Sequence, residues 1–255
     1  MSAANLMTGE ILAQAGTQPP ARPGTDIPLD MPPLFARANF RQVAGETLRP
    51  GGLALTKRAL ALAKLPTAAL VADLGCGRGA TARLLAQAGH RVLALDSNPE
   101  LLDAARGPGV CPLLARAEAV PLADACLDAV FCECVLSVTG AAKNVLAQAA
   151  RMLKPDGVLL LSDLYLRDEN GLRGEGDPAL GAGDCLSGAL PERWLLNALQ
   201  AAGFCVQRFE DHSRLLTELA ARLVFAGIPR AELGFGCGPG ARPGYFLCLA
   251  SKRAQ

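Results

Sequence analysis

Three glycines and two aspartates form a pattern that could bind a nucleoside. Gly75, Gly77 and Gly79 directly follow a short apolar run, and glycines let the backbone turn sharply with no side chain between chain and ligand. Apolar residues at helical spacing come next, so a helix N-terminus with unpaired N–H groups should point into the turn. Asp96 ends a second apolar run 23 residues after Asp73 (96 − 73), where a carboxylate can accept two ribose hydroxyls. The pattern therefore predicts a nucleoside-binding site.

Asp73 distinguishes this turn from a dinucleotide site. It lies two positions before the first glycine, where a carboxylate would repel a pyrophosphate at close range but suits a cationic ligand. The stretch 73–79, Asp-Leu-Gly-Cys-Gly-Arg-Gly, with a second acid at Asp96, resembles the first two motifs of class I S-adenosylmethionine (SAM)-dependent methyltransferases of the type 11 group. The resemblance implies that Asp73 and the turn hold the methionine part of SAM, and that Asp96 holds its ribose.

Further cofactor contacts follow from the same resemblance. Residues 116–122 are similar to the family's loop across the adenine, and Arg116 stands where family members commonly carry an acid. We therefore expect backbone groups of the next two residues to hold the adenine. Residues 151–157, Arg-Met-Leu-Lys-Pro-Asp-Gly, resemble a structural family motif that stops a helix and makes a tight turn. The implied cofactor-binding residues are Asp73, Gly75, Cys76, Gly77, Gly79, Asp96, Ser97, Ala117, Glu118 and Cys132.

The chemistry of methyl transfer places few demands on side chains. Displacement at a sulfonium depends mainly on positioning and on excluding water, and a base is needed only when the acceptor carries a proton at neutral pH. We therefore assign no catalytic residue. Glu133, Asp163 and Tyr165 follow strand ends that should face the cleft, since ligands bind beyond the carboxyl ends of such strands. Capping and turn hydrogen bonds explain these three side chains equally well.

Two cysteine-containing segments indicate an acceptor class. Residues 133–138 and 183–190 resemble segments that carry arsenic-binding thiols in arsenite methyltransferases, and soft thiolates suit a soft, thiophilic ion. The chain departs from that family because no cysteine precedes Cys76. The resemblance implies an acceptor pocket in which Cys134 and Cys185 face one another. Its substrate residues would be Glu133, Cys134, Tyr165 and Cys185.

The elements that must position these residues alternate between strand and helix signals from Leu70 onward, which favours a parallel sheet with helices on both faces. The expected fold class is α/β, a three-layer αβα Rossmann-like sandwich with a seven-stranded, mostly parallel sheet whose last strand, 244–251, is antiparallel. Residues 34–48 and 53–65 read as helices. The expected domains are an N-terminal extension at 1–50, partly disordered or lid-like, in which Arg49 could meet a carboxylate, and a methyltransferase domain at 51–255.

Composition narrows the partners. The chain has 255 residues, with 25 basic and 24 acidic side chains, and no basic stripe that would favour nucleic acid. No apolar run approaches the roughly 18 residues of a membrane span. Nine cysteines without a paired C-x-x-C framework are typical of thiols in a reducing cytoplasm, and the N-terminus lacks an export signal. We therefore expect a cytoplasmic protein that acts on a small molecule, and the oligomeric state stays open.

The leading hypothesis is a SAM-dependent methyltransferase with a small-molecule acceptor, for which a metalloid or thiol-bearing molecule such as arsenite is one candidate. An NAD-dependent oxidoreductase would share the glycine turn and Asp96, but it should show a second mononucleotide half and a proton-relay residue. A non-enzymatic thiol metal-binding protein would use the cysteines and need no cofactor pocket. We expect no resident metal.

Overall fold

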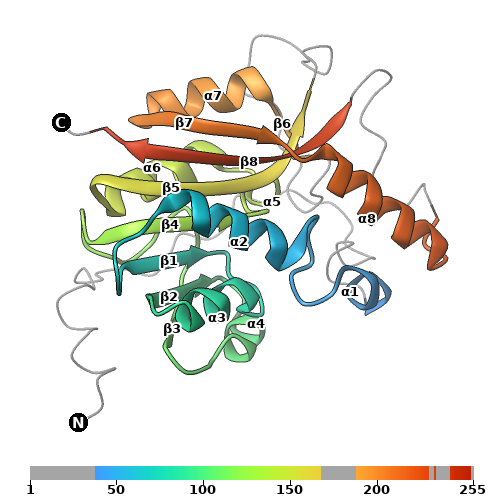
Figure 1. Cartoon of the computed structure of the whole chain (residues 1–255), viewed down its shortest axis with the longest axis horizontal. Helices are drawn as coiled ribbons and strands as arrows, with labels where there is room; N and C mark the ends of the chain where they lie inside the picture. The colour runs from blue at the N-terminus through green and yellow to red at the C-terminus, as the bar shows by residue number, and fades with distance from the viewer. Residues whose placement is uncertain (1–37, 168–187, 230–232, 234–241, 254–255) are drawn as a thin grey trace, which may run out of the picture.

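One mixed sheet positions most of the described candidate site residues. The computed structural model describes residues 38–167, 188–229, 233 and 242–253 (Figure 1). The strands are β1 (Leu70–Leu74), β2 (Arg91–Asp96), β3 (Val110–Leu114), β4 (Leu127–Glu133), β5 (Leu153–Leu166), β6 (Leu190–Pro191), β7 (Phe204–Asp211) and β8 (Pro243–Lys252). Their order is β3-β2-β1-β4-β5-β8-β7, with the short β6 beside β5. Among these strands β8 runs antiparallel to both β5 and β7, and the other pairs are parallel.

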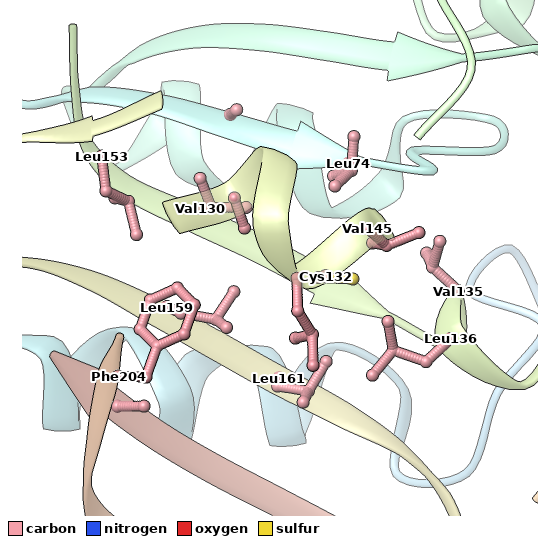
Figure 2. Close-up of a cluster of buried hydrophobic side chains, with 14 of the residues drawn as sticks. Leu74, Val130, Cys132, Val135, Leu136, Val145, Leu153, Leu159, Leu161 and Phe204 are labelled. Carbon is pink, nitrogen blue, oxygen red and sulfur yellow. The ribbon is translucent and has the colours of Figure 1, made fainter. Parts of the chain in front are cut away.

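Helices cover both faces of the sheet, as a parallel sheet requires. The helices against the sheet are α2 (Gly52–Ala63), α3 (Ala80–Gln87), α4 (Pro99–Ala104), α5 (Leu136–Thr139), α6 (Ala142–Met152) and α7 (Glu192–Ala201). One face packs against α2 and α3 through a cluster that includes Leu55, Leu85 and Phe131. The opposite face packs against α5, α6 and α7 (Figure 2). The predicted αβα Rossmann-like fold is confirmed.

Two further helices form a small core of their own. Helices α1 (Ala38–Ala44) and α8 (Ser213–Phe225) meet through a third cluster, which includes Phe40, Leu219 and Leu223. Since α8 directly follows β7, it lies at the carboxyl edge of the parallel strands, where Figure 1 also shows α1.

The first described helix, α1, is shorter than predicted. A helix was expected over 34–48, whereas α1 spans Ala38–Ala44, and 34–37 lie outside the described residues. Gly45, with φ 75°, follows at once, and this left-handed conformation cannot continue a helix. The expected helix at 53–65 closely matches α2. The domain division at residue 50 stays a prediction. None of the described helices is long and apolar enough to cross a membrane.

An ion-pair cluster ties α2 to the edge of the sheet. Glu210 on β7 accepts from Nε and Nη2 of Arg58 on α2, both at 2.6 Å, and from Nε of Arg208 at 2.6 Å. A nitrogen of His212 lies 3.1 Å from the same carboxylate. The hydrogen bond from Arg58, with those from Arg208 and His212, lowers the pKa of Glu210 to about 2, against a smaller opposing effect of burial. The cluster holds α2 in place above the sheet.

We expect Glu210→Gln to lower the Tm at pH 7 by about 2–4 °C. The ordinary pKa of a glutamate, about 4.3, lies above the folded value, so the carboxylate stabilises fully above pH 4.3 and loses this effect as the pH falls toward 2. Thermal denaturation followed by circular dichroism should therefore show the variant and the wild type converging below about pH 4.

Asp124→Asn serves as the control, because it removes an exposed carboxylate from its pair with Arg151, and we expect it to change the Tm little. A Tm difference for Glu210→Gln that stays constant from pH 7 to pH 2 would contradict this role of the cluster.

Candidate functional site

The turn after β1 is anchored to the end of β2. The N–H of Gly75 donates to the carbonyl oxygen of Leu95 at 2.8 Å. The N–H of Gly77 donates to Oδ2 of Asp96 at 2.8 Å, and Oδ1 of the same carboxylate accepts from the N–H of Asn98 at 2.9 Å. The acid expected to hold a ribose therefore lies directly against the glycine turn, at the carboxyl edge of the sheet.

The three glycines of the turn have different reasons to lack a side chain. A Cβ on Gly75 would lie 2.5 Å from the side chain of Val135, and one on Gly79 would lie 2.6 Å from that of Ala105. These two glycines permit close packing within the protein. A Cβ on Gly77, whose φ is +53°, would meet nothing within 4 Å. Gly77 therefore borders open space, as a position that a ligand approaches should.

Asp73 is a buried carboxylate with an unused oxygen. Only 2% of the residue is exposed, and its Oδ2 has no hydrogen-bond partner among the described residues. Burial raises the pKa of Asp73 to about 8, and the charge of Glu133 adds to this effect, whereas Arg49 and the N–H of Ala82 oppose it. An unsatisfied buried carboxylate is costly, so this oxygen is suited to a positively charged donor.

Arg49 lies in the connection between α1 and α2 and reaches the end of β4. Its Nη2 donates to Oε2 of Glu133 at 2.7 Å and to Oγ1 of Thr81 at 3.1 Å, and it also contacts the hydroxyl of Thr56. Burial works to lower the pKa of Arg49, but the charge of Glu133, followed by smaller contributions, raises it above its ordinary value. The buried Nε of Arg49 has no partner among the described residues.

Glu133 accepts three hydrogen bonds from side chains. Besides Arg49, the hydroxyl of Thr56 donates to Oε1 at 3.0 Å and that of Thr81 to Oε2 at 2.6 Å. Sequence reasoning found Glu133 but missed both threonines. The available signal was a hydroxyl side chain inside each of two amphipathic helical segments, α2 and α3.

Cys134 turns out of the strand pattern. With φ 55°, its side chain packs on the face of α2 and α3, whereas Cys132 packs on the opposite face. Sγ of Cys134 lies 3.2 Å from the hydroxyl of Tyr245, which lies 3.3 Å from Oγ of Ser162. Burial raises the pKa of Tyr245 well above its ordinary value. Sequence reasoning did not identify Tyr245, because nothing near it in the chain resembles a motif.

Two expected cleft residues take structural roles instead. Asp163 accepts from Oγ of Ser137 at 2.5 Å and from its N–H at 3.2 Å, so it caps α5. Burial raises the pKa of Asp163 to about 6 despite these hydrogen bonds. The ring of Tyr165 lies edge-on to those of Phe209 and Phe246, with centroids 5.6 Å apart in each pair. Tyr165 therefore packs in the core on the face opposite Cys134, contrary to the expectation of a shared pocket.

Three cysteines remain among the expected cofactor and substrate contacts. The thiol of Cys132 is buried in the cluster that Figure 2 shows, beside Val145 and Leu161, and not in the cofactor site where it was expected. Burial raises its pKa well above the ordinary value. Sγ of Cys76 lies 3.6 Å from the carbonyl oxygen of the next residue. Cys185 lies outside the described residues, so its pairing with Cys134 stays a prediction.

The residues expected beside the adenine and ribose are partly exposed. Ser97 is exposed, and Ala117 and Glu118 are half-buried. Arg116 stands where the family commonly has an acid, and its Nη2 donates to Oε1 of Glu118 at 2.9 Å. The side chain of Glu118 is therefore engaged with Arg116. The backbone of this loop is what remains to contact a ligand.

A cavity adjoins this edge of the sheet. It has a volume of about 690 Å³ and is lined by the α1–α2 connection and by one side of α8. Arg49, Gly52, Leu215, Glu218 and Phe225 contribute to its wall. Arg49 thus borders the cavity and also reaches Glu133. The described residues contain no group of three or more His, Cys, Asp or Glu side chains placed to hold a metal ion.

Comparisons with known proteins agree with this geometry. Residues 72–161 match the family model described as "Methyltransferase domain", a range that contains Asp73 and Glu133 but not Arg49. The chain is 39% identical over 94 residues to a malonyl-[acyl-carrier protein] O-methyltransferase of Serratia marcescens, covering 36% of this chain and 37% of that protein. It is 32% identical over 117 residues to the uncharacterized methyltransferase YodH of Bacillus subtilis, covering 44% and 50%. The chain thus spans at most half the length of these relatives.

Solved structures share the fold over most of the chain. The [4+2]-cyclase SpnF has a TM-score of 0.65 at 19% identity, covering 85% of this chain and 93% of that one. Phosphoethanolamine N-methyltransferase 2 of Haemonchus contortus, in complex with SAM, has a TM-score of 0.65 at 16% identity, covering 85% and 56%. Residues 72–161, which contain the glycine turn, are therefore similar to a methyltransferase domain, and the fold is one that these solved structures share.

Proposed function

We propose that this protein transfers a methyl group from SAM to a small-molecule acceptor. The observation that carries the proposal is a pair of unused buried atoms, Oδ2 of Asp73 and Nε of Arg49, on side chains close enough to influence each other's pKa. The methionine end of SAM is a zwitterion, which needs an acceptor for its ammonium and a donor for its carboxylate. These two atoms supply one of each.

The rest of the nucleoside fits the turn. Gly77 leaves space for the ligand, Asp96 would accept from the ribose hydroxyls, and the backbone of Ala117 and Glu118 would contact the adenine. When bound, SAM supplies an electrophilic methyl group on a sulfonium. The side chains of this site bind and orient it, and their burial excludes water from the reacting atoms.

Calorimetric titration with SAM and with NADH tests the proposal, and Asp73 gives it a pH signature. A carboxylate with a pKa of about 8 is largely protonated at pH 6, and pairing with an ammonium requires the charged form. SAM affinity should therefore rise as the pH increases from 6 to 8, by up to about tenfold per unit. Asp73→Asn should bind SAM weakly and with a flatter profile.

Preferential binding of NADH would favour the oxidoreductase, and binding of neither nucleotide would favour the thiol metal-binding protein. A pH-independent SAM affinity in the wild type would remove Asp73 from the ammonium contact.

Gly77→Val should abolish SAM binding, because the new side chain would fill the space left for the ligand. Gly89 provides a matched control: it too has a positive φ, +90°, and a Cβ there would also meet nothing within 4 Å. Both variants carry similar backbone strain, so their circular dichroism spectra and Tm should match. Equal SAM affinity for Gly77→Val and Gly89→Val would mean that the glycine turn is only a connection.

The candidate bases are all engaged among the described residues. Glu133 accepts three hydrogen bonds, Asp163 caps α5, and Tyr165 lies on the other face of the sheet. The acceptor should therefore be a nucleophile without assistance at neutral pH. A metalloid such as arsenite meets this condition through the lone pair of its arsenic, and a thiol-bearing molecule meets it in its thiolate form. We propose that Cys134 contacts this acceptor.

A carboxylate is a second acceptor class with the same property. The Serratia relative is named as an O-methyltransferase of a malonyl group, and an ionised carboxyl oxygen needs no base. Because the candidate bases are engaged, a carboxylate is as suitable an acceptor as a thiolate. Whether Cys134 contacts the acceptor distinguishes the two.

We expect arsenite to raise the Tm of the wild type, because a ligand that binds the native state stabilises it by mass action. Cys134→Ser and Cys185→Ser should each lose this shift while keeping SAM affinity. Cys205→Ser, which changes an exposed thiol on β7, is the control and should keep the shift. A wild type that does not respond, or a shift that survives in Cys134→Ser, would leave the carboxylate as the acceptor.

A further inference from the structure

Four separate segments meet at the carboxylate of Glu133. Arg49 precedes it by 84 residues and comes from the α1–α2 connection. Thr56 comes from α2 and Thr81 from α3. The side chains of Arg49 and Glu133 are 5% and 7% exposed, with N and O 2.7 Å apart. This buried junction joins the first helices to the carboxyl end of β4.

The hydrogen bonds of this junction join three side chains to Glu133. A threonine hydroxyl has one proton to donate, and Thr56 and Thr81 both use it on Glu133, at 3.0 and 2.6 Å. Nη2 of Arg49, which carries two protons, lies within hydrogen-bond distance of both hydroxyl oxygens and of Oε2 of Glu133, so the three acceptors share these protons. The arrangement holds the guanidinium through Nη2.

Nε of Arg49 takes part in none of these hydrogen bonds. Nη1 lies 3.4 Å from the carbonyl oxygen of Thr47, whereas the buried Nε has no partner among the described residues. A buried charged donor without an acceptor is costly. We therefore expect Nε to donate to an acceptor on a bound ligand. Another unused buried atom, Oδ2 of Asp73, lies close enough to Arg49 for the two charges to interact.

We infer that Glu133 is a positioning residue, which holds Arg49 so that its Nε donates to the methionine carboxylate of the cofactor. The inference rests on the proposed SAM binding and deepens it. Glu133 itself touches neither acceptor nor cofactor, in contrast to the substrate contact expected from its place at a strand end. Thr56 and Thr81 complete the clamp, and Thr56 and Arg49 lie outside the segment that matches the family model.

Glu133→Gln changes little in volume but replaces one acceptor oxygen by a donor NH₂ group. The amide NH₂ would face either the hydroxyl proton of Thr56 or the donors of Thr81 and Arg49. Either way two donors meet, and Arg49 loses its ionic partner. We therefore expect the guanidinium to leave its position, with Asp73 and the glycine turn unchanged.

The test compares SAM with decarboxylated SAM, which keeps the ammonium, ribose and adenine but lacks the carboxylate. Calorimetry should show the wild type binding SAM more tightly than the decarboxylated compound by about tenfold or more, the size of one charged hydrogen bond. Glu133→Gln should weaken SAM by about tenfold and leave the affinity for decarboxylated SAM within about twofold of the wild type. Asp124→Asn, which breaks the exposed pair with Arg151, should change neither affinity.

Thr56→Val is the second variant, in case Glu133→Gln loses its fold by circular dichroism. It keeps both charges and the volume but removes one donor to Glu133, so we expect a smaller loss that is again confined to SAM. Equal losses for both ligands would mean a merely structural role and would overturn the inference. Equal affinities of the wild type for both ligands would overturn the contact between Arg49 and the carboxylate. A wild type that binds neither ligand would instead refute the proposed function.

Discussion

The buried ion pair between Arg49 and Glu133 is the interaction on which the site depends. Burying two charges costs several kcal/mol per ion unless geometry and further hydrogen bonds compensate. Here Thr56 and Thr81 supply the hydrogen bonds, and a 2.7 Å contact supplies the Coulomb energy. Because its partners come from α2, α3 and β4, the pair can form only when the sheet and its helices are assembled. The same pair then fixes Arg49, which borders the cavity and reaches the end of β4.

The fold alone does not determine the reaction. SpnF, a [4+2]-cyclase, shares this architecture over 93% of its length, and function belongs to sites carried by folds. The residues that distinguish this site from the common methyltransferase segment lie largely outside the range that matches the family model, which ends at Leu161. Arg49 and Thr56 precede that segment, and Tyr245 follows it. The glycine turn and Asp73 thus belong to the matched segment, whereas Arg49, which holds Glu133, and Tyr245, which contacts Cys134, come from outside it.

Local patterns in the sequence predicted the features that depend on neighbouring residues. The apolar runs, the glycine turn and the acid at the end of β2 are all local, and the αβα fold that they predicted is confirmed. The direction of a side chain at a strand end depends also on the strand alternation and on the local backbone conformation. The alternation of side chains along a strand places Tyr165 on the sheet face that α7 covers. Its position at a strand end had instead suggested that it faces the cleft. Alternation fails at Cys134 because its left-handed backbone turns the thiol to the other face.

The partners that sequence reasoning missed share one cause: each is joined to its contact across the sheet or between helices. Thr81 meets Glu133 across 52 residues, and Tyr245 meets Cys134 across 111. No window of sequence contains both members of such a pair. A buried charge nevertheless predicts that partners exist, since an unpaired carboxylate inside a protein is costly. Glu133, at the end of the buried strand β4, therefore required donors from distant parts of the chain, and a residue so fully engaged is poorly suited to act as a base.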